Sequence, residues 1–358
     1  MILQRYIVSE IFKPTVAILM VLIAIFASYC AVTYLAEAVG GLLAPDTIGL
    51  LILLKIGMAL EVLLPTTFYL ATIIALGRLY QDSEMTAFAA CGVGMGGVLK
   101  PVFVLALPVA LLAGVSSLYI RPEAYEKIYR VRDQAQNEFD ISRLSSEHFL
   151  EMQSGKFVFF AEDVQDKALG AQQVFIRVAE GDQRQVITAQ AMTQVQSDPA
   201  GRRMLRFRDG VFVQFPLTAQ GGRVTRFERA EYPLPTEDPS ESRYRRKAAP
   251  TESLIGSERL EDIAEMQWRL STPLSTLLLA LLGVPLSKSS PRKGKFANLG
   301  LAIVIFAFYY QLFVIAKTWV EKGVVSPLLG IWWVPALLAG LTLVLLWRTG
   351  EVFYRKPG

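Results

Sequence analysis

The sequence predicts an α-helical integral membrane protein of six transmembrane helices, with one all-β, jelly-roll-like domain inserted in the middle of the chain. Hydrophobic residues make up 53% of its 358 residues, more than the roughly 45 to 50% of soluble domains. Long uncharged apolar runs lie near both ends of the sequence. Between them apolar and polar residues alternate, which is typical of β-strands. These observations predict two sets of spans around one domain outside the membrane.

The first apolar run, residues 14 to 36, contains no charge and is long enough for a membrane helix, which needs about 20 apolar residues. A secretory signal peptide is the alternative, because Arg5 and Lys13 precede the run and Ala36-Glu37-Ala38 resembles a cleavage site. The apolar region of a signal spans only about 7 to 15 residues, and further spans follow. We therefore interpret this run as a retained helix.

The second run, Ile48 to Leu76, differs because it contains Lys55 and Glu61. As a helix it extends roughly 43 Å, beyond the hydrocarbon core of about 30 Å, so its charged end can reach the interface. Lys55 and Glu61 are six residues apart and do not share a helix face, so no ion pair between them is predicted. Charges within a membrane often mark function, but an interfacial position is the stronger interpretation here.

The remaining uncharged runs are residues 101 to 120, 271 to 287, 296 to 316 and 323 to 347. Lys and Arg in short connections mark the cytoplasmic side of a membrane protein. With a cytoplasmic N-terminus, that side holds Arg5, Lys13, Arg78, Lys100, Lys288, Arg292, Lys293, Lys295, Arg348, Arg355 and Lys356. The short outer connections hold only Lys317 and Lys322. We expect both termini inside, spans one to three in residues 1 to 120 and spans four to six in residues 268 to 358.

Residues 121 to 267 then form an external domain with helical flanks. Its alternating segments are residues 156 to 164, 172 to 180, 185 to 196, 203 to 215 and 223 to 234, separated by turn-forming residues. A sandwich or a jelly-roll-like sheet is the economical assignment. The alternation predicts one inward face made of Phe157, Phe159, Val174, Ile176, Phe207, Val211 and Val213. The basic run from Arg243 to Lys247 reads as a solvated loop.

The stretch SEMTAFAACGVGMGGVLKP, residues 83 to 101, contains glycines at the spacing G-x-G-x-x-G. A dinucleotide site needs a strand before such glycines and a helix after them, whereas here a helical segment precedes them and a membrane run follows. A P-loop needs Lys and Ser or Thr where Val98 and Leu99 stand. No nucleotide site is predicted in this chain.

Residues 77 to 91 are instead predicted to form a short cytoplasmic helix, which the glycines end. Ser83 or Asp82 can cap it, and Met85, Phe88 and Ala89 share one face by i, i+3, i+4 spacing. Docking onto another protein and a solvated loop without a partner fit the composition equally well.

Other chemistry has little support in the sequence. The net charge of +4 is too small to indicate nucleic-acid binding. His148 is the only histidine, and Cys30 and Cys91 are the only cysteines, so neither a metal site nor a disulfide is predicted. There is no Walker motif and no nucleophile with a neighbouring base, so the chain is not predicted to be an enzyme or to bind a cofactor.

The segment LGRLYQDSEMTAFAACGVG, residues 76 to 94, resembles the coupling segment of the LptF/LptG lipopolysaccharide export permeases of Gram-negative bacteria. The segments MILQRYIVSEIFK, AEMQWRLSTPLS and VPLSKSSPRKGK are similar to the LptF branch of that family in particular. The similarity runs from end to end, including three spans on either side of a periplasmic β-domain.

This resemblance implies a non-catalytic membrane subunit of an ABC transporter in the bacterial inner membrane. Such a subunit extracts lipopolysaccharide and passes it through its periplasmic β-jelly-roll toward the outer membrane. The implied partners are an LptG-type permease in a heterodimer, an LptB ATPase dimer, which binds ATP and Mg, and LptC.

The resemblance also assigns residues. Glu84 matches the glutamate that engages the ATPase, and Tyr80 and Met85 flank it. Spans one and five line the lipid cavity in the family, so Lys317 and Lys322 are candidate partners for lipid phosphates; interfacial snorkelling is the alternative, above all for Lys322. The candidate lipid lining in the β-domain is Phe157, Phe159, Val211 and Val213, for which an ordinary core is the alternative.

Rival functions belong to other classes. An ion-driven secondary transporter is expected to show internal repeats and interrupted spans, and no such repeat is seen in the sequence. A membrane-anchored periplasmic scaffold or sensor normally carries a signalling domain in the cytoplasm, where this chain is predicted to have only short connections.

Overall fold

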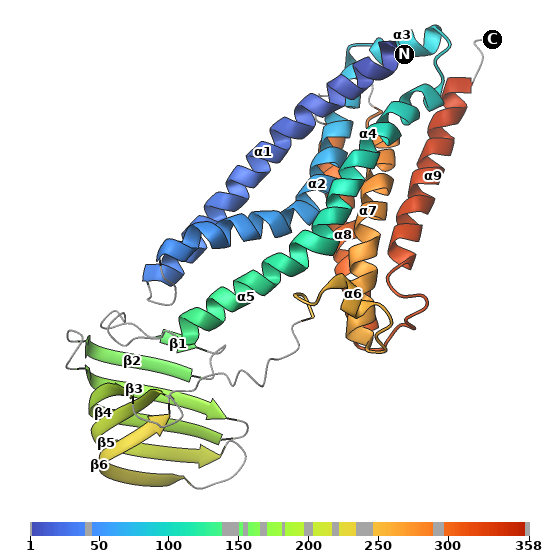
Figure 1. Cartoon of the computed structure of the whole chain (residues 1–358). Helices are drawn as coiled ribbons and strands as arrows, with labels where there is room; N and C mark the ends of the chain where they lie inside the picture. Colours follow the sequence, from blue (N-terminus) through green and yellow to red (C-terminus); the bar gives the residue numbers. More distant parts are fainter. Residues whose placement is uncertain are drawn as a thin grey trace. The chain divides into compact units, whose positions relative to one another are not determined.

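The computed structural model describes residues 2–39, 45–137, 150–152, 157–164, 170–180, 183–196, 203–216, 222–233, 246–288 and 297–354. The chain forms two compact units (Figure 1). The helical unit contains Met1–Cys30, Ile52–Ile128 and Arg243–Gly358, and the sheet unit contains Ala31–Leu51 and Tyr129–Ser242.

The long helices are α1 (Ile2–Val39), α2 (Ile48–Gln81), α4 (Met95–Val115), α5 (Arg121–Asn137), α7 (Leu260–Leu286), α8 (Ala297–Glu321) and α9 (Trp333–Tyr354). A 3₁₀ turn, Pro45–Thr47, precedes α2, and the short helices are α3 (Glu84–Ala90) and α6 (Thr251–Leu254). A π-helical turn, Ser116–Ile120, joins α4 to α5 without a break in the helix. Such π-turns are frequent at functional sites.

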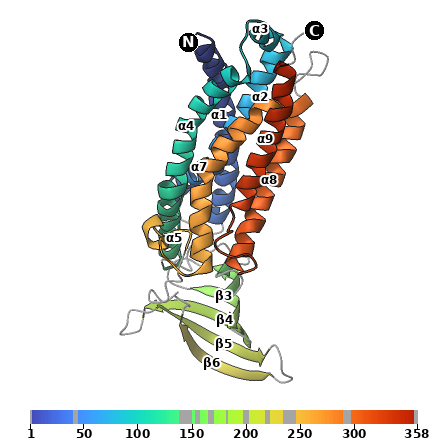
Figure 2. The same cartoon turned by 90° about the vertical axis from the view of Figure 1, so that its right-hand side faces the viewer.

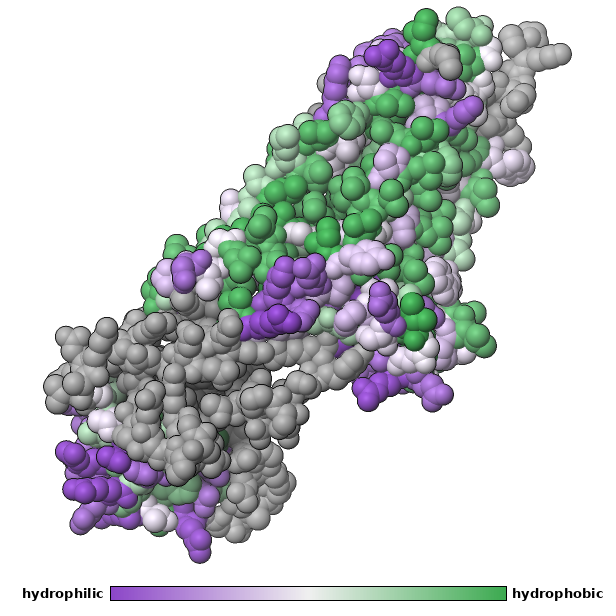
Figure 3. Space-filling model, viewed as in Figure 1, coloured by the Kyte–Doolittle hydropathy of each residue, from purple (hydrophilic) through white to green (hydrophobic). Residues whose placement is uncertain are grey.

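Among the described residues, five helices are long and apolar enough to cross a membrane, namely Ile2–Val39, Pro45–Gln81, Met95–Arg132, Leu260–Leu286 and Asn298–Glu321. A shorter apolar segment, Trp333–Arg348, lies within α9. Figure 3 shows hydrophobic residues covering the middle of the visible face of the helices, with hydrophilic residues toward either end. The multi-pass membrane class predicted from the sequence is therefore confirmed.

Two apolar clusters hold the helical unit together. One joins the beginning of α1, the end of α2, α3, the beginning of α4 and the end of α7, and the other joins α2, α7, α8 and α9. Helix α7 contributes to both clusters and is the most buried span, with 67% of its apolar window inside the protein. Figure 2 shows α7 between α4 on one side and α8 and α9 on the other. Polar side chains on α7 are therefore placed to contact several helices at once.

The sheet unit contains one six-stranded antiparallel sheet. Its strands are β1 (Leu150–Met152), β2 (Phe157–Val164), β3 (Ala171–Glu180), β4 (Gln183–Gln196), β5 (Arg203–Pro216) and β6 (Arg223–Pro233). Each strand pairs with its neighbours in sequence, in the order β1-β2-β3-β4-β5-β6. The inserted all-β domain is thus confirmed, and the described strands form a single sheet rather than the two sheets of a sandwich.

A row of exposed polar residues crosses this sheet: Glu162, Gln173, Gln190, Asp209 and Glu228. The pairing between strands is interrupted at this row in four successive strand pairs. Two of its residues have left-handed backbone, with φ of 49° at Gln173 and 50° at Asp209. A left-handed residue within a strand shifts the alternation of side chains by one position, as β-bulges do.

The shift at Asp209 corrects the predicted inward face. Phe207, before the shift, lies in the buried core of the sheet, as predicted. After the shift, Phe212 packs against that core, so the half-buried Val211 and Val213 lie on the opposite face from Phe207. Strict alternation placed all three on one face, because a sequence pattern of period two does not reveal a left-handed residue within the strand.

Candidate functional site

The corner between α2 and α4 carries the segment predicted to couple to a partner. Residues 77 to 81 are the last turn of α2, and α3 begins at Glu84. Ser83 lies between them with φ of 61°, and its side chain makes no capping hydrogen bond. The segment from 77 to 91 is therefore divided, and a left-handed residue separates the two parts.

Glycine ends α3, as the sequence predicts. The Val93 N–H donates to the Phe88 carbonyl at 2.9 Å, and the Gly92 N–H donates to the Ala89 carbonyl at 3.0 Å. With φ of 79° at Gly92, these bonds form the Schellman motif that often ends helices. Helix α4 then begins at Met95, with Gly94 in extended backbone before it. The glycines turn the chain back toward the membrane helices.

One face of α3 is buried in the protein. Met85 is 1% exposed and Tyr80, in the last turn of α2, is 8% exposed. Both belong to the apolar cluster that also contains Ile7 and Leu79, and Phe88 packs against the same cluster. Tyr80 and Met85 therefore hold α3 in place from inside, and the exposed residues of α3 are Thr86, Ala87 and Ala90.

Glu84 is half-buried at the start of α3 and accepts a hydrogen bond from a side chain of α1. The Tyr6 hydroxyl lies 2.9 Å from one carboxylate oxygen of Glu84 and 3.2 Å from the other. Arg78 in α2 forms an ion pair with Glu10 in α1. Figure 1 shows α3 beside the N-terminal end of α1. Polar contacts thus join the first turns of α1 to this corner.

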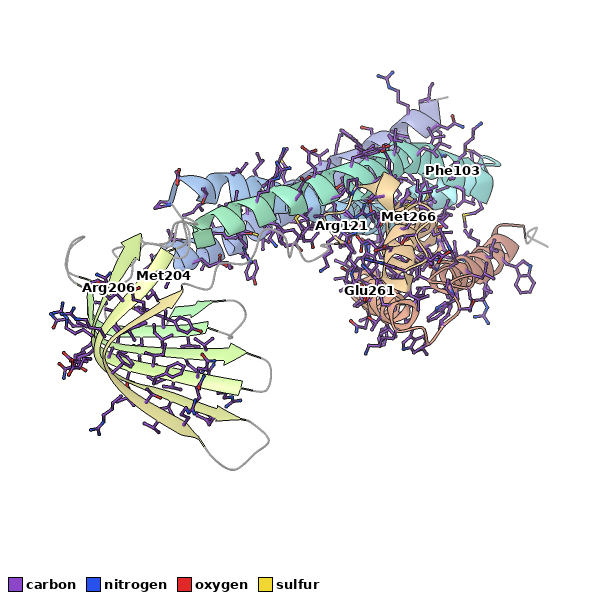
Figure 4. The ribbon with its side chains drawn as sticks, turned by 60° about the horizontal axis from the view of Figure 1, so that its bottom comes forward. Phe103, Arg121, Met204, Arg206, Glu261 and Met266 are labelled. Carbon is purple, nitrogen blue, oxygen red and sulfur yellow. The ribbon has the colours of Figure 1, made fainter. Side chains whose placement is uncertain are left out.

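A second polar site lies inside the helical unit. We call the charge cluster the five side chains that α2, α5, α7 and α8 contribute to it: Glu61, Arg121, Glu265, Arg269 and Lys317. Glu265 and Arg269 are 0% exposed. Figure 4 shows Arg121 close to α7, which carries Glu265. Charged groups are almost never fully buried unless they are paired.

Glu265 is the centre of the charge cluster. One of its oxygens lies 3.0 Å from Nη1 of Arg121 and 3.2 Å from Nε of Arg269. Its other oxygen lies 2.5 Å from Nζ of Lys317. The Lys317 ammonium also lies 4.9 Å from the centre of the Trp268 ring, a geometry for cation–π attraction. Glu265 therefore forms ion pairs with cations from three helices.

Glu61 is the second anion of the cluster. One oxygen lies 3.2 Å from Nε of Arg121. The other accepts hydrogen bonds from Trp268 Nε1 at 2.7 Å, Ser117 Oγ at 2.9 Å and Thr272 Oγ1 at 3.2 Å. Glu61 is thus buried among polar partners inside the helical unit, while its depth relative to the membrane interface stays a prediction.

The cluster also fixes the chain where it returns from the sheet unit to the helices. Nη1 of Arg269 donates to the Ala249 carbonyl at 3.0 Å and to the Thr251 hydroxyl at 2.9 Å. The Thr251 hydroxyl in turn donates to the carbonyl of Leu118 in the π-helical turn at 2.5 Å. Arg246 forms ion pairs with Glu261 and Glu321. The described end of the predicted basic loop is therefore bound to α7 and α8.

A cavity of about 40 Å³ lies beside the cluster. Its walls include Glu61, Trp268, Thr272, Ser275, Tyr309 and Tyr310. The surface that faces this space is mostly apolar, so the space provides few polar partners for a bound water.

The residues predicted to contact lipid lie in different environments. Lys317 is 13% exposed and forms an ion pair with Glu265, whereas Lys322 is exposed at the end of α8. Phe159 is in the core of the sheet. Phe157 begins β2, and its side chain lies outside the described residues. In contrast to Phe159, Arg206 projects outward and pairs with Glu231 on the neighbouring strand (Figure 4).

Sequence reasoning missed Arg121, Glu265 and Arg269 as a site. A signal was present, because Glu265 and Arg269 are four residues apart in a segment that becomes a membrane helix, and charges in such helices often mark function. Arg121 follows directly on an uncharged run and was assigned to the external domain.

Comparison with known proteins identifies the family. A family model described as "Lipopolysaccharide export system permease LptF/LptG" matches residues 5–348. The chain is 26% identical, over 98% of its length and 96% of the relative, to lipopolysaccharide export system permease protein LptF of Escherichia coli strain K12. The protein of the same name from Shigella flexneri gives the same values. These matches confirm the resemblance seen in the sequence, and the chain belongs to the LptF/LptG family of lipopolysaccharide export system permeases.

Proposed function

We propose that this permease is the LptF-type subunit of an ABC transporter, which extracts lipopolysaccharide from the inner membrane with energy from a partner ATPase. The α2–α3–α4 corner is the observation that carries this proposal. It presents a short helix between two spans, with one face packed in the protein and the other exposed. A short helix fixed in this way is suited to enter a groove on another protein.

Glu84 is the proposed contact with the ATPase. A carboxylate at the start of a helix can accept charge-assisted hydrogen bonds from an arginine of the partner. The exposed Thr86, Ala87 and Ala90 are small enough for close approach. Tyr80 and Met85 then act from inside, because their burial fixes the position of α3. ATP and Mg are bound by the partner in this proposal, and the chain itself is not catalytic.

The chemistry of the substrate supports a need for ATP. Transfer of acyl chains from a bilayer to water costs about 0.8 kcal/mol per CH₂, which amounts to tens of kcal/mol for a multi-acyl lipid. The chains must therefore pass from the membrane onto apolar protein surface. We propose that the periplasmic sheet unit receives them along the face of the sheet that carries Phe159 and Phe207, with LptC continuing the path.

The proposed arrangement places both termini in the cytoplasm and pairs the chain with an LptG-type permease. Lys322 is exposed and is the more accessible candidate for lipid phosphates. Lys317 can reach a phosphate only after it leaves Glu265.

Glu84→Ala tests the proposal, with Asp82→Ala as the matched control. Asp82 is an exposed carboxylate at the same corner, with its only described ion pair to Arg78 at 3.9 Å. We expect Glu84→Ala to reduce co-purification of the ATPase at least about tenfold, the effect of losing a buried charged hydrogen bond, and Asp82→Ala to leave it unchanged. Full ATPase association and lipid export in Glu84→Ala would contradict the proposed function.

A further inference from the structure

The first turns of α1 are attached to the α2–α3 corner by apolar contacts. Ile7 and Ile11 are 0% exposed and belong to the same cluster as Met85 of α3. Farther along α1 the large apolar side chains point outward, and Met20 and Ile25 are more than 60% exposed. Within the described helical unit, the buried apolar side chains of α1 are therefore Ile7 and Ile11 near its beginning and Cys30 farther along.

Polar contacts reinforce this attachment on one face of α1. Tyr6 bonds to Glu84, and Glu10 pairs with Arg78. Tyr6 and Glu10 are four residues apart, so both lie on the same side of the helix, one turn from each other. One contact is made with α3 and the other with the end of α2, and together they bridge the break at Ser83.

The bond from Tyr6 leaves Glu84 free to accept further donors. A phenol has one proton, so it donates one hydrogen bond at a time, whereas a carboxylate offers about four acceptor positions. An arginine from a partner can therefore bind Glu84 while Tyr6 remains bonded to it. The hydroxyl fixes the direction of the carboxylate and does not block it.

We propose that Tyr6 is a positioning residue that ties Glu84 to α1, so that the first turns of α1 move together with α3 when the ATPase changes its nucleotide state. This inference rests on the proposed docking of an ATPase at Glu84. In this proposal, movement at the ATPase docking contact is passed from Glu84 to α1 through the Tyr6 hydroxyl.

Tyr6→Phe isolates this hydroxyl, because the ring and its packing are kept. Tyr119→Phe is the matched control, since Tyr119 is 65% exposed. In the full transporter, spin labels are attached to the native exposed Cys91 beside α3 and to Ser9→Cys, an exposed position on α1. Cys30, the other cysteine, is buried. The distance between the labels is measured with ADP and with a non-hydrolysable ATP analogue.

With Tyr6 present, and in Tyr119→Phe, we expect the same distance distribution in both nucleotide states. In Tyr6→Phe we expect the distribution to shift or broaden with the ATP analogue. Lipid extraction per ATP hydrolysed is expected to fall about tenfold in Tyr6→Phe, as for loss of one hydrogen bond to a charged group, while the ATPase still co-purifies.

Two results overturn the inference. One is a Tyr6→Phe variant whose label distances and lipid extraction match those of the parent. The other is loss of ATPase co-purification in Tyr6→Phe, because the hydroxyl then acts in docking rather than in coupling. Both are distinct from failure of the proposed function, in which Glu84→Ala itself keeps the ATPase and export.

Discussion

Glu265 is the residue on which most of the buried charge in the helical unit depends. It forms ion pairs with Arg121, Arg269 and Lys317 at distances of 2.5 to 3.2 Å. Removal of one partner from a buried ion pair is strongly destabilising, because the remaining charge keeps its desolvation penalty. The cluster therefore makes the packing of α5, α7 and α8 sensitive to this single carboxylate.

We expect Glu265→Gln, which keeps the side-chain shape, to lower the free energy of unfolding by about 3 to 5 kcal/mol. Thermal unfolding of the purified protein in detergent measures the effect. Glu123→Gln is the control, because Glu123 is exposed and its only ion pair among the described residues is with Lys127 one turn away, a contact worth about 0.3 to 0.5 kcal/mol. Equal stability losses in both variants would show that Glu265 contributes no more to the free energy of unfolding than a surface ion pair does.

The pairing with Lys317 is tested by a double substitution. Glu265→Gln combined with Lys317→Met removes one anion and one of its cations together. Because directly contacting residues couple, the double variant is expected to lose less stability than the sum of the single variants. A strictly additive result would show that the 2.5 Å contact contributes nothing to folding.

The sequence predicted Glu84 as a special residue because it lies in a motif, but it could not predict the charge cluster. The members of the cluster come from residues 61 to 317 and meet only after the helices have packed. Lys317 illustrates the limit. Its position in the sequence suggests contact with lipid, and only the folded arrangement shows that the Lys317 ammonium is bonded to Glu265.

At the scale of elements, the turn after α3 decides how the coupling segment is presented. Gly92 has φ of 79° with no atom within 4 Å of an added Cβ, so the backbone conformation alone favours glycine there. For other residues the left-handed conformation costs roughly 1 to 2 kcal/mol.

We expect Gly92→Ala to lower the unfolding free energy by about 1 kcal/mol and to weaken ATPase association. Gly96→Ala is the control, because Gly96 has equal space for a Cβ but lies in the first turn of α4, where alanine favours the helix. Thermal unfolding and co-purification measure the two effects. Equal results for the two variants would exclude a role for the left-handed turn.

The polar row across the sheet is a second element-level feature. Asp209 is left-handed within β5, a conformation that a β-branched residue adopts only with strain. We expect Asp209→Val to destabilise the sheet by about 1 to 3 kcal/mol, seen as faster hydrogen exchange in β4 to β6. Arg208→Val, at the exposed neighbouring position, is expected to leave exchange unchanged, and a slower exchange in Asp209→Val would refute the role of the row.

Elements were predicted with unequal success for a physical reason. Long apolar runs give membrane helices because lipid requires all backbone groups to be bonded within the segment. Strands were also found, since alternation marks a half-buried surface. The alternation shifts at Gln173 and Asp209, where the backbone is left-handed. The types of these two residues do not predict that conformation within a strand.

For the whole molecule, the apolar surface of the helical unit is the dominant property. Side chains such as Met20, Leu111 and Trp347 are more than 60% exposed, which is unfavourable in water and suited to lipid. Composition alone predicted this surface. The chain divides into two compact units, and the helical unit is closed by two apolar clusters together with the charge cluster.

The chain leaves the helical unit through α5 and returns to it at residues 246–251, and both passages are bonded to the same part of α7. Arg121, at the start of α5, contacts Glu265, and the returning Ala249 is held by Arg269, one turn farther along. An insertion whose two ends are fixed side by side imposes little constraint on what lies between them. The length and sequence of the insertion can therefore change while both of its ends stay bonded to α7.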